Sequence, residues 1–386
     1  YEISLGLVGS EMCIRDRKHI WGRTDLIPLW VADMDFATAP FVTDAIRKRC
    51  ENEVLGYTGK PDSYYNAIIN WVKQRYDLVV AKEMINFVPG IVPGIGMAMN
   101  CFTQKGDKVM IQPPVYHPFA WVTTRNERTL VTNPLKWENG MYRMDLDTFR
   151  EQIKGCKLFI LCNPHNPGGV VWTEAELRAI ADICYDEKVL VFSDEIHADL
   201  TLPPHTHRPF ATVSEKARMN SVTFMSPSKA FNMPGLSASH ALIFNEDLRK
   251  RFRIYMDAGE LDMGHVFAFL SVEAAYSHGT EWLDQCLAYI QGNIDFVDDF
   301  LKNHAPKIKA IRPEASYLVW LDCRELKLSQ KDLNEFFVDK AHLALNDGEM
   351  FGKEGIGFMR LNVASPRCII EKAMKQLADA YQLYIK

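Results

Sequence analysis

The chain has 386 residues, which is enough for two domains or for one large α/β domain with a smaller appendage. Its content of 47% hydrophobic and 24% charged residues is typical of a globular protein that folds in water. The formal net charge of −5 provides no basic surface for nucleic acid or an anionic membrane. No apolar run approaches the roughly 18 residues of a membrane span. Composition therefore argues against nucleic-acid-binding and membrane-spanning classes.

The cysteines and the first residues bear on location and processing. Nine cysteines are scattered singly without a Cys-x-x-Cys pair, which indicates reduced thiols and a cytoplasmic location. Residues 1–17 resemble translated sequencing-adaptor sequence, and we interpret them as non-native and assign them no function.

From residue 46 to residue 279, helical patterns alternate with short apolar runs rich in β-branched residues. Strands that are apolar on both faces and separated by helices predict an α/β domain with a mostly parallel sheet covered by helices. Residues 18–45 are predicted to pack against a second, smaller domain. The predicted strands of the large domain are residues 84–88, 108–112, 129–131, 158–162, 190–193, 221–225 and 241–244.

The pattern changes after residue 279. Long amphipathic helices are predicted over residues 281–301 and 369–385, around strands at 316–321 and 357–362. Residues 280–386 are therefore predicted to form a small α+β domain.

The turn after the predicted strand at residues 84–88 is a candidate phosphate site. A dinucleotide-binding glycine fingerprint is rejected because Met99 stands where the close helix-strand contact requires glycine or alanine. Pro93 near the start of a helix leaves the backbone N–H groups of Ile91 and Val92 free. These donors suit a single phosphate ester.

Two polar residues follow neighbouring predicted strands. Asn166 lies in a turn rich in proline and glycine after residues 158–162, and Asp194 follows 28 residues later. That spacing accommodates a helix over residues 174–186 and a parallel neighbouring strand. Because ligands bind at the carboxyl ends of such strands, both side chains are predicted to face one crevice.

Lys229 lies 35 residues after Asp194, in the segment Ser226-Pro227-Ser228-Lys229. A pyridoxal phosphate enzyme needs this pair, because a lysine amine binds the cofactor covalently and a carboxylate keeps its ring nitrogen protonated. A surface lysine after a turn is the alternative for an isolated Ser-x-Ser-Lys motif. The strand, acid and asparagine upstream favour the cofactor site.

These motifs occur in the order Asn-Pro-His-Asn-Pro, Ser-Asp-Glu-Ile-His and Ser-Pro-Ser-Lys-x-Phe-Asn. The sequence thereby resembles fold-type I pyridoxal phosphate enzymes of the class I/II aminotransferase superfamily. It is most similar to the branch of MalY/PatB-type cystathionine (cysteine-S-conjugate) β-lyases. The resemblance extends from about Ile20 to the C-terminus and includes residues 28–36, 56–58, 112–116 and 357–362.

The resemblance implies an aspartate aminotransferase-like fold and a homodimer with shared active sites. Lys229, Asp194 and Tyr116 are its implied catalytic residues, with Tyr116 stacked on the cofactor ring. Tyr57 is implied to reach the phosphate from the partner subunit. The other implied cofactor-binding residues are Asn166, His197, Ile91, Val92, Ser226 and Ser228.

Departures and substrate residues refine the expectation. Arg360 resembles the arginine that binds the substrate α-carboxylate, since a guanidinium matches that planar anion. The residues expected along the approach of the thiol portion are Trp30, Asp33, Met34 and Tyr57. Ser237 stands where many aminotransferases have a phosphate-binding arginine, which favours the lyase branch.

His197 replaces a tyrosine found in many aminotransferases of this fold, and a satisfied histidine at a strand end is the alternative reading. His205 and His207 have no matched ligand pair and are predicted to be solvated, so no metal is expected.

The reaction expected is β-elimination from L-cystathionine or related cysteine S-conjugates, giving pyruvate, ammonia and a thiol such as homocysteine. An aminotransferase would use the same residues and is the nearest alternative. A regulatory protein that retains the cofactor is the second alternative. The amino-acid substrate is thus the expected small-molecule partner, and no nucleic acid or membrane partner is expected.

Overall fold

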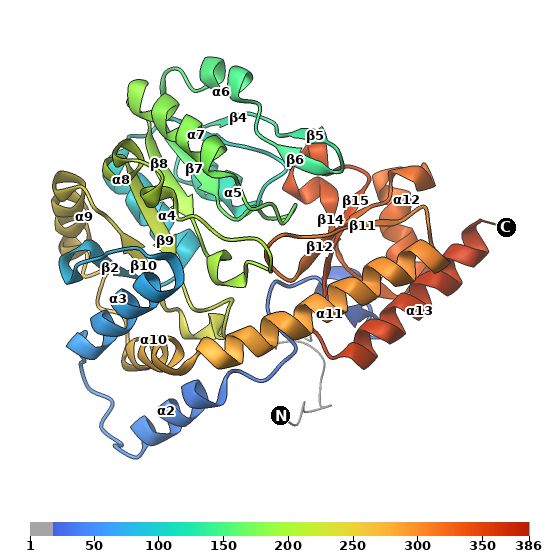
Figure 1. The fold of residues 1–386 in the computed structure, drawn as a ribbon, viewed down its shortest axis with the longest axis horizontal. Coiled ribbons are helices and arrows are strands. Elements are labelled where there is room, and N and C mark those ends of the chain that lie inside the picture. The colour runs from blue at the N-terminus through green and yellow to red at the C-terminus, as the bar shows by residue number, and fades with distance from the viewer. Residues whose placement is uncertain (1–17, 386) are drawn as a thin grey trace.

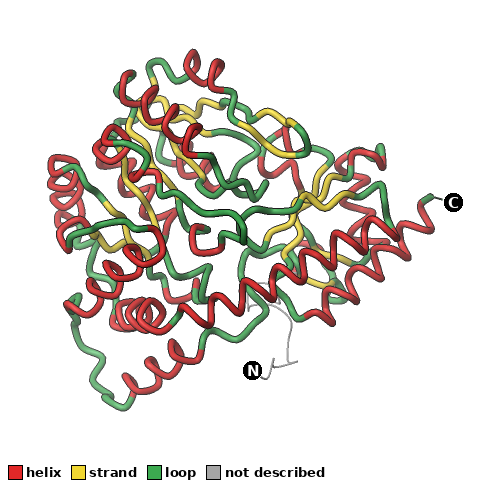
Figure 2. The backbone as a smooth tube through the Cα atoms, viewed as in Figure 1, coloured by secondary structure: helices red, strands yellow, loops and turns green. Residues whose placement is uncertain are grey.

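The protein is described by a computed structural model that covers residues 18–385. The segment that we interpret as non-native, residues 1–17, lies outside the described residues. Two sheets lie side by side, a large one and a small one, and loops occupy the region between them (Figures 1 and 2). No helix in the described part of the chain is both long and apolar enough to cross a bilayer.

The large sheet has seven strands in the order β2-β10-β9-β8-β7-β3-β4. Strands β9, β8, β7, β3 and β4 pair in parallel, whereas β10 is antiparallel to both β9 and β2. The sheet is therefore mixed but mostly parallel, as the sequence predicts. Its strands are β2 (Ile85–Val88), β3 (Lys108–Ile111), β4 (Thr129–Thr132), β7 (Cys156–Cys162), β8 (Leu190–Asp194), β9 (Ser221–Met225) and β10 (Ser239–Leu242).

Alternating residues of the central strands pack into two different cores, one on each face of the sheet. Leu158 and Ile160 join the core under α4 (Ile91–Phe102), α5 (Pro118–Arg125) and α9 (Glu246–Ala258). Phe159 and Leu161 join the opposite core, with α6 (Leu146–Gln152), α7 (Glu174–Asp186) and α8 (Glu215–Met219). Burial on both faces explains why these strands read as continuous apolar runs.

The β2 end of the sheet is covered by α2 (Pro40–Cys50), α3 (Asp62–Tyr76) and α10 (Val266–His278), which share a third core. One predicted strand is displaced. The apolar run predicts residues 241–244, but β10 pairs from Ser239, which lies opposite Val88. The buried polar pair Ser239 and His240 hides this start from a pattern based on hydrophobicity.

The small sheet is antiparallel, in the order β11-β12-β15-β14, and α11 packs with α13 beside it. Helix α11 begins at Thr280, where the sequence places a domain boundary, although the division itself remains a prediction. The elements are α11 (Thr280–His304), β11 (Lys309–Ile311), β12 (Leu318–Asp322), α12 (Gln330–Glu335), β14 (Asn346–Asp347), β15 (Phe358–Asn362) and α13 (Arg367–Tyr384), and a separate hairpin joins β5 (Lys136–Glu138) and β6 (Met141–Arg143).

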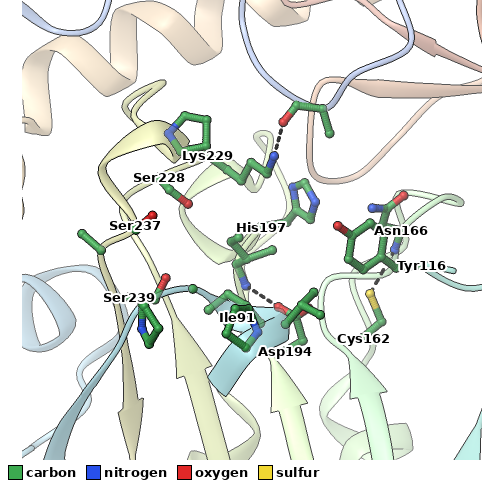
Figure 3. Close-up of a pocket in the computed structure, with 18 residues that line it drawn as sticks. Ile91, Tyr116, Cys162, Asn166, Asp194, His197, Ser228, Lys229, Ser237 and Ser239 are labelled. Carbon is green, nitrogen blue, oxygen red and sulfur yellow. Dashed lines mark hydrogen bonds between the residues drawn. The ribbon is translucent and has the colours of Figure 1, made fainter. Parts of the chain in front are cut away.

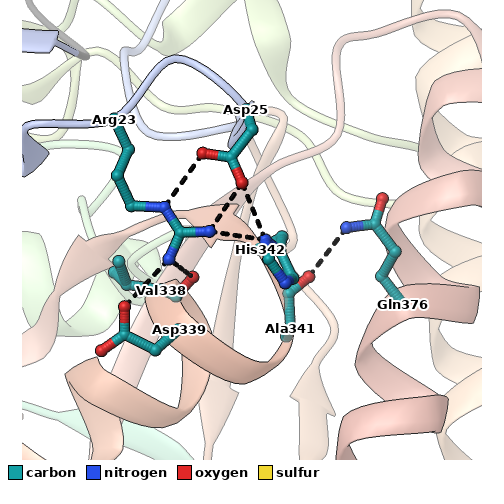
Figure 4. A network of polar contacts seen from close by, with 7 residues as sticks. All are labelled: Arg23, Asp25, Val338, Asp339, Ala341, His342 and Gln376. Carbon is teal, nitrogen blue, oxygen red and sulfur yellow. Dashed lines mark hydrogen bonds and ion pairs between the residues drawn. The ribbon is translucent and has the colours of Figure 1, made fainter.

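The N-terminal segment is attached to this small unit. Strand β1 (Ile27–Pro28) pairs in parallel with β13 (Leu343–Ala344). Just before β1, Arg23 forms ion pairs with Asp25 at 2.6 Å and Asp339 at 2.9 Å, and Asp25 also contacts His342 at 3.0 Å (Figure 4). These exposed contacts lie at the start of the segment that leads to Ala32.

Candidate active site

A cavity of about 220 Å³ lies at the carboxyl edge of the large sheet (Figure 3). The loops after β2, β3, β7, β8 and β9 contribute to its wall, and so does the first residue of β10, which runs in the opposite direction. The rule for parallel sheets therefore accounts for most of the wall. Lys229, Asp194, Asn166, Tyr116 and His197 all line it, as the sequence predicts.

Asp194 ends β8 and is 3% exposed. Its Oδ1 accepts a hydrogen bond from the Ile196 backbone N–H at 3.0 Å. Burial raises the pKa of the carboxyl to about 7, an effect that the Ile196 bond and the positive charge of Lys229 only partly oppose. A cationic N–H placed against this carboxylate would therefore gain a strong ionic hydrogen bond.

Lys229 follows β9 and lines the same cavity. Its Nζ donates a hydrogen bond to the backbone carbonyl of Ala32, from the N-terminal segment (Figure 3). Burial lowers the pKa of the amine to about 8, although Asp33 and Asp194 oppose this effect. An amine with such a pKa is partly unprotonated near neutral pH, which nucleophilic and general-base roles require.

Asn166 links the cavity to the small sheet. Arg360 on β15 donates from Nη1 to Asn166 Oδ1 at 3.0 Å, and its Nη2 donates to the Trp30 carbonyl at 3.1 Å and to Asn346 Oδ1. Arg360 is 4% exposed and does not itself line the cavity. Its buried Nε has no hydrogen-bond partner among the described residues, so the guanidinium retains a donor for a ligand.

The start of α4 supplies the predicted phosphate donors. Gly90, Ile91 and Val92 line the cavity, and the first N–H groups of a helix have no partner within it. Ser228 lines the cavity beside them. This end therefore has the free N–H donors that a phosphate ester needs.

Direct contact between Ser226 and the phosphate, which the sequence suggests, is not supported by the geometry. The Ser226 hydroxyl donates to the Ala238 carbonyl at 2.8 Å, also contacts Ser228 Oγ at 2.9 Å, and does not line the cavity. Ser237 and Ser239 line it instead. Ser239 could have been found only by recognising that an antiparallel strand brings its amino-terminal end to this edge.

The aromatic residues of the wall are largely withdrawn from water. Burial raises the pKa of the Tyr116 hydroxyl, so this side chain stays neutral. Burial lowers the pKa of His197 to about 3, and its Nδ1 has no hydrogen-bond partner in the described chain. A neutral imidazole with an unused ring nitrogen can contact a polar ligand atom.

Like Arg360 and Ser226, the predicted residues Trp30, Asp33, Met34 and Tyr57 do not line the cavity. Trp30 contributes its carbonyl to Arg360, while its indole N–H is buried without a partner in the described residues. Asp33 is 8% exposed and interacts electrostatically with Lys229. Tyr57 is 98% exposed, on the loop between α2 and α3.

The prediction that His207 is solvated is wrong. His207 is 4% exposed, and its Nε2 contacts Glu195 Oε2 at 2.8 Å. The Pro-rich loop itself is exposed, and so is His205, as predicted, but the His207 ring turns inward onto Glu195 next to the end of β8. No group of three potential metal ligands occurs within residues 18–385.

The arrangement fits pyridoxal phosphate on structural grounds. Asp194 is a buried carboxylate with room for a cationic ring nitrogen, and Tyr116 offers an aromatic face. The unpaired N–H groups of Ile91 and Val92 suit the phosphate, and Lys229 supplies the amine. A single planar ring with one phosphate ester therefore satisfies each of these groups.

Comparison with known proteins agrees with the geometry. The aminotransferase class I and II family model matches residues 24–377. The cystathionine beta-lyase PatB of Bacillus subtilis (strain 168) is 38% identical over 363 residues, or 94% of each chain.

Two solved structures are similar over nearly the whole chain. Cystalysin from Treponema denticola, which contains a pyridoxal 5′-phosphate cofactor, has a TM-score of 0.94 and 34% identity, covering 100% of this chain and 98% of that one. The PLP-bound C-S lyase from Staphylococcus hominis has a TM-score of 0.90 and 33% identity, covering 99% and 98%. The protein described here belongs to the aminotransferase class I and II family.

Proposed function

We propose that this protein is a pyridoxal phosphate-dependent carbon–sulfur β-lyase. It cleaves L-cystathionine or related cysteine S-conjugates to pyruvate, ammonia and a thiol, which is homocysteine when cystathionine is the substrate. The observation that carries the proposal is the convergence of Lys229 and Asp194 on one cavity. It occurs in a chain 38% identical to a cystathionine beta-lyase over 94% of both sequences.

Asp194 sets the electronic state of the cofactor. When bound, pyridoxal phosphate supplies an electron-accepting ring joined to the substrate nitrogen, which acidifies the Cα–H bond and allows a β-substituent to leave. Asp194 would hold the ring nitrogen in its protonated form through an ionic hydrogen bond. That partner favours the ionised form of the carboxylate, which burial alone disfavours.

Lys229 moves the proton. With substrate and cofactor bound, the Lys229 Nζ would be the group that removes the Cα proton. The lowered pKa of about 8 leaves a useful fraction of the amine unprotonated while retaining basicity. The sulfur would then leave Cβ as a thiolate with the electron pair of the C–S bond, as the Cα–H pair forms a Cα=Cβ bond. Water would hydrolyse the released unsaturated amino acid to pyruvate and ammonia.

Arg360 and Asn166 orient the substrate. The α-carboxylate can bind the free Nε of Arg360. It can also accept from the Arg360 Nη1 and Nη2 groups, which otherwise donate to Asn166 and to the Trp30 carbonyl. Binding at this point places the Cα–H bond relative to Lys229, which lines the adjoining cavity. Orientation of this kind accounts for a large part of the rate enhancement of bound reactions.

A product assay on a panel of cysteine conjugates tests the proposal. The purified protein, saturated with pyridoxal phosphate, is incubated with cystathionine and no keto acid. Catalytic formation of pyruvate and a free thiol is expected. Borohydride reduction of the resting protein should give a cofactor adduct on Lys229, which mass spectrometry of its peptide detects.

The variant Lys229→Ala should lose both turnover and the adduct, with Lys250→Ala as a matched control. Lys250 is exposed and pairs with Glu246, so its loss should change neither readout. Activity that requires an added keto acid would make the protein an aminotransferase. Bound cofactor without turnover, together with a stable protein complex, would favour the regulatory alternative.

We also propose a cytoplasmic homodimer in which Tyr57 contacts the phosphate bound by the partner subunit. The support is the exposure of Tyr57, at 98%, beside Val54 and Leu55 at 73% and 61% on the same loop. Contact with a second copy would cover these side chains. Light scattering should give twice the chain mass, and Tyr57→Phe should weaken cofactor binding without dissociating the dimer.

A further inference from the structure

The environment of the Lys229 amine contains an acceptor that the sequence does not indicate. The Ala32 carbonyl accepts hydrogen bonds from two donors, Lys229 Nζ and the Tyr317 hydroxyl, the latter at 3.0 Å. Ala32 lines the cavity, whereas Tyr317 is fully buried behind it at 0% exposure. One backbone oxygen thus joins a chemically active amine to a buried tyrosine.

The segment that carries this carbonyl is fixed at both ends. Asn362 on β15 donates from Nδ2 to the carbonyls of Val31 and Asp33, at 2.7 and 2.6 Å. Asn232, three residues after Lys229, donates from Nδ2 to the Met34 carbonyl at 2.9 Å and accepts from the Met34 N–H at 3.0 Å. We call residues 30–36 the bridging segment, because it joins the small sheet to the lysine loop.

These contacts hold the Ala32 carbonyl in place independently of the position of the Lys229 side chain. Asn232 adopts a positive φ of 52°, which turns its side chain back onto the bridging segment from the loop that carries Lys229. The distance between the lysine backbone and its acceptor is therefore set by hydrogen bonds from the Asn232 and Asn362 side chains to the backbone of the bridging segment. Ordering the acceptor in advance reduces the entropy lost when the long lysine side chain docks there.

We propose that the Ala32 carbonyl, held by Tyr317 and flanked by the Asp33 carboxylate, is where Lys229 Nζ docks when released from the cofactor, and that these groups stabilise its protonated form. This inference rests on the proposed function, in which Lys229 takes the Cα proton. The Cα–H bond breaks and an N–H bond forms on Lys229. The electron pair of the C–H bond becomes the Cα=Cβ double bond, while the thiolate leaves with the electron pair of the C–S bond. Tyr317 and Asp33 act as positioning residues.

The charged groups that face Lys229 support this assignment. Asp33 of the bridging segment and Asp194 of β8 favour the ammonium form, and Arg360 of β15 opposes it. His197 is held neutral by burial, which lowers its pKa to about 3, and burial together with Asp33 raises the pKa of Tyr317, which keeps its hydroxyl a donor. Of the two acids, Asp33 has the larger effect on Lys229.

The role of Asp33 thus differs from the substrate contact that the sequence suggests. Its neighbours are the lysine acceptor Ala32 and the tyrosine that holds this acceptor. Removing the Asp33 charge should lower the pKa of the free amine, because one of the two stabilising carboxylates is lost. Removing the Tyr317 hydroxyl should loosen the acceptor while leaving every charge in place.

Competitive acetylation measures the free amine directly. The full-length chain, freed of cofactor, is labelled with trace acetic anhydride across a pH series, and labelling of Lys229 is read by mass spectrometry. For Asp33→Asn, the midpoint of Lys229 labelling should fall by about one pH unit. Asn is isosteric and leaves the backbone carbonyl bound by Asn362 unchanged, so folding should be retained.

In the cofactor-loaded enzyme, the acidic limb of the kcat profile should move to lower pH in Asp33→Asn. Tyr317→Phe should lower kcat by about fivefold at unchanged KM, the typical effect of one lost hydrogen bond. Tyr64→Phe is the matched control, because Tyr64 is fully buried and its hydroxyl has no partner within the described residues. Asp25→Asn controls for loosening of the N-terminal segment.

An Asp33→Asn labelling midpoint equal to that of the wild type would overturn the inference. A wild-type kcat in Tyr317→Phe would do the same. Both results are distinct from failure of the proposed function, in which the wild type itself would form neither the borohydride adduct nor pyruvate. The wild-type assay is therefore run first and decides between the two failures.

Discussion

Asp194 and Glu195 are adjacent acids at the end of β8, yet they occupy opposite electrostatic environments. Glu195 is 1% exposed and is fully hydrogen-bonded, with Ser193 Oγ, the Phe210 N–H and His207 Nε2 each at 2.8 Å. Asp194 accepts one backbone hydrogen bond and faces the cavity. The strand alternation turns one acid into the interior and the other toward a ligand.

The difference teaches where to look for function in this fold. A buried carboxylate that is satisfied by several donors stabilises the structure, whereas one left short of partners is costly until a ligand binds. The raised pKa of Asp194, about 7, reflects that cost. Burial alone does not mark a functional acid; burial with missing partners does.

The largest expected effect comes from removing the Asp194 charge. Asp194→Asn cannot keep the ring nitrogen protonated, so kcat should fall by about a thousandfold. Steady-state pyruvate formation measures this loss. A fall of less than about tenfold would contradict the role assigned to Asp194.

The same substitution should stabilise the cofactor-free protein at high pH. The folded pKa of Asp194 lies above the unfolded value, so this group lowers the free energy of unfolding as pH rises from about 4 to about 7, and the cost is constant above that pH. Asp194→Asn removes that cost, which should raise the free energy of unfolding by about 2 kcal/mol at pH 8. Urea unfolding at pH 5 should show a smaller difference.

Glu195→Gln should show the reverse pattern, with a loss of stability and little loss of turnover per folded molecule. The amide NH₂ would face the His207 N–H, so the hydrogen bond is lost unless the imidazole changes tautomer. We expect about 2 kcal/mol of destabilisation in urea titrations. An undiminished free energy of unfolding would show that the satisfied acid contributes little to the fold.

Arg360→Lys tests a side chain whose two terminal nitrogens are hydrogen-bonded while its Nε has no partner in the described residues. A lysine cannot form the forked contacts of the guanidinium, so the affinity for the substrate carboxylate should fall. We expect KM for cystathionine to rise by about tenfold, with a smaller change in kcat. An unchanged KM would exclude Arg360 as the carboxylate site.

The smallest effect is expected at the exposed polar network of Figure 4. Hydrogen bonds from Arg23 and His342 lower the pKa of Asp25, so its contribution is present above the ordinary carboxyl pKa and is lost as pH falls. Asp25→Asn should change Tm by less than about 2 °C at pH 7, since exposed ion pairs are weak. A larger shift would mean that this network anchors the bridging segment.

Much of this could be predicted because parallel sheets obey simple rules. Apolar runs locate the strands, and successive parallel strands bring Asn166, Asp194 and Lys229 to one edge. The helix predicted over residues 174–186 coincides with α7. Residues whose positions depend on local sequence pattern and on the order of the strands could thus be predicted from the sequence.

What could not be predicted depends on contacts between distant segments. The Ala32 carbonyl lies 197 residues from Lys229 along the chain, and Asn346, on the two-residue strand β14, accepts a hydrogen bond from Arg360 on β15. The partner of the Ser226 hydroxyl depends on a rotamer, and the burial of His207 depends on the direction in which its ring turns. Residue type and spacing do not encode any of these.

The bridging segment has a consequence for substrate choice. The Trp30 carbonyl holds the arginine for the α-carboxylate, and two residues later the Ala32 carbonyl holds the catalytic amine. An amine that lacks the α-carboxylate would leave Arg360 without its anionic ligand. Arg360 is bound to one end of the bridging segment, and Lys229 is bound two residues further along the same segment. Discrimination between amino acids and simple amines would then operate through the proton-transfer step as well as through binding.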